Sequence, residues 1–181
     1  MGTLVLNGAT SGSTTLQPTD ATTQTITLPT GNVTLSFNGP AFSAYMGANQ
    51  NISAATTTKI SFNSKDFDTA SCFDAVTNYR FTPNVAGYYQ INLYVDFNST
   101  GNDPPYGTIY VYKNGSPYKQ FRNGVSTTTY VVGGPSMSTI VSMNGSTDYL
   151  EFYGNGASGG SGQYYFGASF TGVSGALVRA A

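Results

Sequence analysis

The sequence predicts an all-β protein whose main domain is a sandwich or jelly roll of roughly ten strands. Three observations support this fold class. Apolar and polar residues alternate in many segments, which is typical of strands with one buried face. Turn residues such as Gly, Pro and Asn recur between these segments. No segment shows the periodicity of a helix of useful length.

The composition indicates a folded but weakly charged protein. The chain has 181 residues, enough for one domain with a core and an appendage. Charged residues make up 8%, hydrophobic residues 39% and aromatic residues 14% of the chain. Many Tyr, Thr, Ser, Asn and Gly residues with few charges are typical of rigid β-rich extracellular or virion proteins. The net charge of -1, without a basic stripe, argues against a nucleic-acid partner.

The chain has no histidine and one cysteine, Cys72. Nucleophilic triads and imidazole metal sites are therefore excluded. No intrachain disulfide can form, and we expect Cys72 to be a buried free thiol. The N-terminus lacks the features of a signal peptide and no stretch approaches transmembrane length, so we expect no membrane association.

Residues 1–38 differ from the rest because they are rich in Thr and Gly and carry a single charge, Asp20. Short runs in which apolar and polar residues alternate predict strands that are too short to bury a core of their own. We expect this region to be a β-rich attachment arm, although a flexible polar linker is the alternative. The apolar residues expected to make the attachment are Leu4, Leu6, Leu16, Ile26, Leu28, Val33 and Leu35.

Residues 39–181 form the predicted globular domain, which begins at Gly39-Pro40. We expect a loop with short extended pieces over residues 65–74 and two hairpins, one across Asn114-Gly115 and one across Asn144-Gly145. Within the segment 78–97, a short strand and a turn precede a long strand. The other expected strands cover residues 41–45, 59–63, 106–112, 118–122, 137–143, 149–153 and the closing pair within 164–178.

Four segments of this domain resemble the C1q-like branch of the C1q and tumour-necrosis-factor superfamily, in the family order. They are FTPNVAGYY at 81–89, IYVYKNG at 109–115, STIVSMNGSTDYLEFY at 138–153 and ASFTGVSGALV at 168–178. The resemblance implies a ten-stranded jelly-roll sandwich that forms a homotrimer. The chain departs from the family because it has no collagen stalk and its cysteine is Cys72 rather than a residue between Phe81 and Pro83. A complement-like or hormone-like role is therefore not implied.

Six tyrosines occupy the strand face opposite the apolar residues, where a solvated strand would more often carry Lys or Glu. A trimer interface would explain them, because Tyr covers apolar area while its hydroxyl still finds a partner. Stacking on sugar rings is the alternative. The several strands involved favour the trimer, whose interface residues we predict to be Tyr88, Tyr94, Tyr110, Tyr112, Tyr149 and Tyr153.

Acidic residues give weak indications of chemistry. The pairs Asp66 with Asp68 and Asp148 with Glu151 would suffice for glycoside hydrolysis. Both pairs lie in or beside turns, so we expect neither an enzyme nor a cofactor. Acidic loops of C1q-like domains sometimes bind calcium, which makes Asp66, Asp68 and Asp74 calcium candidates, although a solvated acidic loop is the commoner outcome.

The arm resembles segments of tail-fibre and other virion proteins of tailed phages, through GTLVLNGATSGSTTLQP at 2–18, TITLP at 25–29 and NVTL at 32–35. We therefore expect a non-enzymatic structural protein of a bacteriophage virion, assembled in the host cytoplasm and bound to capsid or tail proteins. A short fibre and a capsid decoration protein both remain open. The alternative function is a module that binds carbohydrate on the host surface, with a glycan hydrolase third.

Overall fold

The computed structural model describes residues 4–7, 13–16, 39–53, 55–99, 107–123, 134–156, 164–166 and 170–181. The chain divides into two compact units, Met1–Leu35 and Ser36–Ala181. Among the described residues every regular element is a strand, and none of these residues belongs to a helix long and apolar enough to cross a membrane. The sequence-based expectation of an all-β protein is confirmed for the larger unit.

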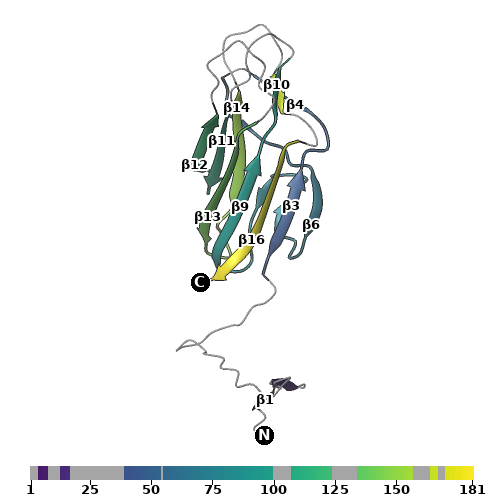
Figure 1. The fold of residues 1–181 in the computed structure, drawn as a ribbon, viewed down its shortest axis with the longest axis vertical. Coiled ribbons are helices and arrows are strands. Elements are labelled where there is room, and N and C mark those ends of the chain that lie inside the picture. Colours follow the sequence, from purple (N-terminus) through teal and green to yellow (C-terminus); the bar gives the residue numbers. More distant parts are fainter. Residues whose placement is uncertain are drawn as a thin grey trace, which may run out of the picture. The chain divides into compact units, whose positions relative to one another are not determined.

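The larger unit is a sandwich of two antiparallel sheets. The first sheet has five strands, which lie side by side in Figure 1. Alternating burial follows the pleat, so successive side chains of β9 point to the core and away from it. In spatial order the strands are β13 (Ser136–Met143), β9 (Gly87–Tyr94), β16 (Gly172–Ala180), β3 (Ala41–Tyr45) and β6 (Ser64–Asp68).

The second sheet has six strands and packs against the first. It consists of β12 (Ser116–Asn123), β11 (Gly107–Lys113), β14 (Leu150–Gly156), β8 (Arg80–Phe81) and β7 (Phe73–Asp74) in spatial order, with β5 (Thr58–Lys59) also paired to β14. A small third sheet joins β10 (Phe97–Ser99), β15 (Tyr164–Phe166) and β4 (Gln50–Ile52).

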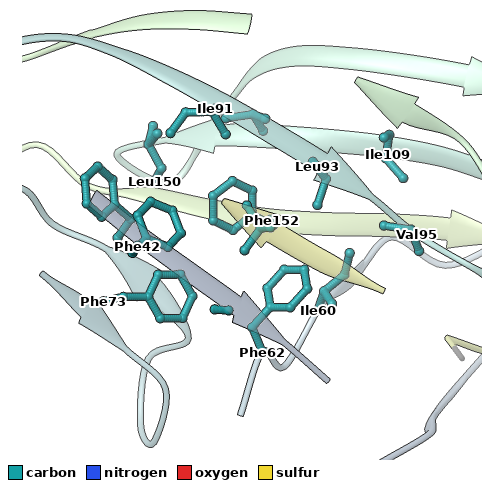
Figure 2. Close-up of a cluster of buried hydrophobic side chains, with 14 of the residues drawn as sticks. Phe42, Ile60, Phe62, Phe73, Ile91, Leu93, Val95, Ile109, Leu150 and Phe152 are labelled. Atoms are coloured by element: carbon teal, nitrogen blue, oxygen red, sulfur yellow. The ribbon is translucent and has the colours of Figure 1, made fainter. Parts of the chain in front are cut away.

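The core lies between the two main sheets and is rich in phenylalanine (Figure 2). Phe42 stacks on Phe73 and on Phe81, with ring centroids 4.9 and 4.5 Å away. Phe62 meets Phe152 edge to face. Such ring pairs add to the hydrophobic gain from burial, so the core rests on aromatic packing between the sheets rather than on covalent staples. Cys72 is a buried free thiol, as predicted.

The hairpin across Asn114-Gly115 is confirmed. Asn114 and Gly115 both have positive φ angles, 53° and 78°, as a two-residue turn between twisted strands requires. Strands β11 and β12 pair antiparallel on either side of it, with an irregularity at Val111 and Tyr112.

The hairpin predicted across Asn144-Gly145 is wrong. Strand β13 pairs with β9 in the five-stranded sheet, whereas β14 pairs with β11 in the six-stranded sheet. The segment between them crosses from one layer to the other. Asn144 stabilises this crossing because its side-chain oxygen accepts hydrogen bonds from the amides of Ser146, Thr147 and Asp148.

Two other segments differ in detail from the expectation. The segment 65–74, predicted as a loop with short extended pieces, contains β6, an edge strand of five residues that pairs with β3. The segment 59–63, predicted as a strand, is a strand only at Lys59, although Ile60 and Phe62 are fully buried. Burial of alternate side chains therefore persists at Ile60 and Phe62 beyond the end of the paired strand.

The smaller unit contains a two-stranded antiparallel sheet of β1 (Leu4–Asn7) and β2 (Ser13–Leu16). Leu4 lies opposite Leu16 in its register. The other expected attachment residues, Ile26, Leu28, Val33 and Leu35, lie outside the described residues. The role of residues 1–38 as an arm stays a prediction.

Candidate functional site

The six predicted interface tyrosines lie on two different outer surfaces of the sandwich. Tyr88 and Tyr94 belong to β9 of the five-stranded sheet. The other four belong to the six-stranded sheet or to its immediate flank: Tyr110, Tyr112, Tyr149 and Tyr153. Because the inner faces of the two sheets pack on each other, the two groups point in opposite directions, and they cannot form one continuous interface on one subunit.

The first surface, called here the uncharged face, is formed by the outward residues of β9 and β13. Tyr88 and Tyr94 are 44% and 47% exposed there, so no further layer of the described residues covers them. The outward residues of the two strands carry no charge. They form the cross-strand pairs Tyr88 with Ser142, Gln90 with Ile140, Asn92 with Ser138 and Tyr94 with Ser136.

Polar side chains in the middle of the uncharged face bind one another. The Gln90 side-chain amide donates to the Ser138 hydroxyl, and that hydroxyl donates to the Asn92 side-chain oxygen at 2.8 Å. Burial of a polar group is costly when it loses its partner. Since Gln90, Asn92 and Ser138 already bind one another, covering the middle of the uncharged face with another protein carries a low desolvation cost.

An apolar edge borders the uncharged face. Strands β12 and β13 are edge strands of the two sheets and lie next to each other. Phe121 on β12 is 45% exposed and Ile140 on β13 is 52% exposed. Large apolar side chains at a sheet edge favour association with another chain.

The second surface, called here the tyrosine platform, is the outer face of β11 and β14. Tyr112 and Tyr153 have ring centroids 4.2 Å apart, and Tyr110 meets Tyr112 edge to face at 6.1 Å. Tyr110 lies directly opposite Tyr153 in the strand register. All three side chains are half-buried. The rings support one another and form a preorganised aromatic row.

A carboxylate is fixed beside these rings. Glu151 receives a 2.6 Å ion pair from the Lys59 ammonium and a 3.1 Å hydrogen bond from the Tyr153 hydroxyl. Burial first, and then the neighbouring negative charge of Glu151, raise the pKa of Tyr153 to about 12. Nearby, the Arg80 guanidinium lies 4.5 Å from the centroid of the Tyr149 ring, which places a cation over an aromatic face.

In the predicted acidic pair of Asp148 and Glu151, each carboxylate binds different structural partners. Asp148 pairs with Lys113 at 2.9 Å and accepts from the Asn114 amide, and both interactions lower its pKa. Glu151 is held by Lys59 and Tyr153 instead. The two carboxylates therefore serve different parts of the fold and do not act as a pair.

The calcium candidates do not form one ligand set. Asp74 accepts hydrogen bonds from the amides of Val76 and Thr77, which hold its pKa below the ordinary value. Burial raises the pKa of Asp68, but the amides of Phe73 and Cys72 and the Lys65 ammonium outweigh it, so the pKa is lowered. Asp66 accepts from the Ser43 hydroxyl at 2.7 Å. Across the part of the chain that the structure describes, no cluster of acidic or thiol groups is arranged to hold a metal ion.

Sequence reasoning missed Lys59 and the apolar pair Phe121 and Ile140. Lys59 is 92 positions away from Glu151, so no local pattern connects them. Phe121 and Ile140 were not predicted to be exposed. Their only signal in the sequence is that each is an apolar residue within or beside a polar run, Phe121 between Gln120 and Arg122 and Ile140 after Ser138 and Thr139.

Comparison with known proteins identifies the fold. By sequence, the chain matches no family model and no curated protein. By structure, it is similar to the globular domain of zebrafish complement 1qA, with a TM-score of 0.54 and 16% identity over 80% of this chain and all (100%) of that one. The PRD1 vertex protein P5 gives a TM-score of 0.55 and 18% identity over 78% of this chain and 98% of that one.

Murine APRIL is a third structural neighbour, with a TM-score of 0.52 and 8% identity over 78% of this chain and all (100%) of that one. These three neighbours are similar to this chain in fold, at identities between 8% and 18%. They match almost their whole length, so the similarity extends over a complete domain. The larger unit of this chain therefore has the C1q/TNF-like jelly-roll fold.

Proposed function

We propose that the chain is a non-enzymatic structural protein of a bacteriophage particle, which forms a homotrimer and attaches through residues 1–38. A short fibre or tail appendage and a capsid decoration protein are the two placements that fit. The observation that carries the association is the uncharged face: the outward residues of β9 and β13 carry no charge, and Gln90, Asn92 and Ser138 in its middle bind one another.

The two exposed surfaces of the sandwich favour a ring over a two-fold dimer. Phe121 lies on the apolar edge, whereas Tyr88 and Tyr94 lie on the uncharged face. Contact of the edge of one subunit with the face of the next is heterologous, and such contacts form a ring when the rotation between subunits closes. A ring of three would cover the edge strands β12 and β13, which are otherwise open to aggregation.

Placement in a particle is supported by two independent likenesses. The fold is shared with a viral vertex protein, the PRD1 protein P5. The segment before the domain resembles virion proteins of tailed phages in its amino-acid sequence. The low charge and many hydroxyl side chains suit a protein that stays folded outside cells.

The test is to image particles that carry a labelled copy of this chain. A gold label fused after Ala181 should mark a regular set of positions on the capsid or the tail, and the pattern distinguishes decoration from a fibre. Particles purified to homogeneity without any label would contradict the virion role. A monomer in sedimentation equilibrium would contradict only the trimer.

A further inference from the structure

The tyrosine platform lies on the opposite side of the sandwich from the uncharged face, so the proposed trimer contact does not account for it. Four tyrosines gather there, and three of them form the row in which Tyr112 stands between Tyr153 at 4.2 Å and Tyr110 at 6.1 Å. Side chains that contact one another lose little further freedom when a ligand binds. The row therefore offers rigid aromatic surface at a low entropic cost.

Fixed polar groups accompany the rings. The Glu151 carboxylate is oriented by Lys59 on one oxygen and by the Tyr153 hydroxyl on the other. Arg80 lies opposite Glu151 in the register of β8 and β14 and covers the ring of Tyr149. Charged acceptors and donors thus stand beside aromatic rings on one sheet face, with their geometry set before any ligand arrives.

The charge balance of the platform indicates what kind of ligand fits. Lys59 and Glu151 neutralise each other beside the row of three rings, and the remaining cation, Arg80, lies over Tyr149 outside that row. A flat protein partner would remove water from this ion pair without replacing its hydrogen bonds, which is unfavourable. A sugar ring has apolar C–H faces that suit aromatic rings and hydroxyl groups that replace the lost water.

We propose that the tyrosine platform binds a saccharide made of neutral hexopyranose units, with sugar rings on Tyr110, Tyr112 and Tyr153 and hydroxyl groups on Glu151 and Lys59. This site does not depend on the virion role or on the trimer. It gives the tyrosines of the six-stranded sheet a function separate from those of the five-stranded sheet.

Binding of the full chain to an array of neutral glucans, galactans and mannans, with uronic-acid and sulfated glycans beside them, tests the site. We expect retention on neutral members, and about tenfold weaker binding after Tyr112→Ala or Tyr153→Ala. Tyr112→Phe keeps the ring and should bind almost as the native chain does. Phe67→Ala, at an exposed position of β6 in the opposite sheet, is the matched control and should leave binding unchanged.

Stability is checked by thermal melting of each variant. If an alanine variant fails to fold, titration of the native chain with the best array member must shift the ring resonances of Tyr112 and Tyr153 in NMR spectra and leave those of Tyr94 in place. The proposal would be overturned if the chain bound no neutral glycan or bound acidic glycans alone. Equal binding by the native chain and by folded alanine variants would also overturn it. A change in oligomeric mass caused by Tyr112→Ala would also overturn it, because the face would then be a contact between copies.

Discussion

Tyr153 and Tyr89 are neutral side chains whose surroundings oppose ionisation. Tyr89 is fully buried and its hydroxyl donates to the Val85 carbonyl at 2.7 Å. Burial raises the pKa of Tyr89 to about 12, and burial together with Glu151 does the same for Tyr153. Both hydroxyls thus keep their protons at pH values where an unfolded tyrosine loses its own.

This difference predicts a loss of stability in alkali. An unfolded tyrosine ionises near its ordinary pKa of 10.0, whereas the folded Tyr89 and Tyr153 ionise near 12. The unfolded state therefore releases protons first, and the free energy of unfolding should fall as the pH rises from 10 towards 12. Denaturant titrations at several pH values measure the slope, and Tyr153→Phe should make it shallower. An unchanged slope in this variant would contradict the role given to Tyr153.

Individual site residues were only partly predictable. Alternation correctly placed Tyr88 and Tyr94 opposite Leu93, because side chains of one strand must alternate. Alternation describes each strand separately, so it could not tell that these tyrosines and Tyr112 belong to different sheets. The ion pair of Lys59 with Glu151 could not be predicted either, since only the tertiary fold brings β5 beside β14.

The two Asn-Gly turns show how similar local sequences serve different connections. Gly115 ends a two-residue hairpin and has only the Tyr149 hydroxyl near the position of an added Cβ, at 3.4 Å. Gly145 lies in the crossing between the sheets, where an added Cβ would approach the backbone nitrogen of Ala86. Both glycines have positive φ angles. They differ in the space around them.

This contrast predicts different costs for the same substitution. Gly115→Ala should destabilise the fold by about 1 kcal/mol, the strain of a positive φ angle. Gly145→Ala carries the same strain and also displaces the backbone at Val85 and Ala86, so its cost should be about 2 kcal/mol higher. Midpoints of urea unfolding measure the pair. Equal losses would show that the crossing relaxes freely.

The sequence predicted where most strands lie, but it did not always predict which strands pair with each other. Strand β11 was found where expected. Strand β9 ends at Tyr94 rather than at Phe97 as expected, because Phe97 begins β10 in the small third sheet. Strand β6 was predicted only as an extended piece of a loop, because an edge strand needs no buried alternation and its middle residues Lys65, Asp66 and Phe67 are exposed. The hairpin of β13 and β14 was wrong because an Asn-Gly pair also occurs in a longer crossing loop, where its local signal is the same.

At the scale of the molecule, the uncharged face should be covered when the chain assembles. In a single subunit Tyr94 is 47% exposed, so replacing it with Asp puts the new charge in water and leaves the fold stable. In the trimer the same charge would be buried without a partner, at a cost on the order of 3 kcal/mol per contact. Tyr94→Asp should therefore dissociate the trimer and leave the thermal transition of the monomer intact.

Sedimentation equilibrium at micromolar concentration measures this effect. Val76→Asp is the matched control, because Val76 lies in an exposed loop between β7 and β8. It should leave the mass of the assembly unchanged. A Tyr94→Asp protein with the native mass would show that β9 faces solvent in the assembled protein.

The last prediction concerns the separate roles of the two units. Strands β1 and β2 have four residues each and form a sheet of two strands. Two-stranded sheets are marginal in water, since ordering the backbone costs about 1 to 2 kcal/mol per residue. The larger unit has its own core between its two sheets.

Deletion of residues 1–38 should therefore leave a domain that melts cooperatively and still forms trimers, but that no longer joins particles. The cause is the loss of the attachment residues, among them Leu4, Leu6 and Leu16 in the small sheet. Electron microscopy of particles assembled with the truncated chain should show the projection missing, while calorimetry of the purified fragment shows the native transition. Normal occupancy on particles would mean that the jelly roll makes the attachment itself, through a surface such as the edge of β12 and β13.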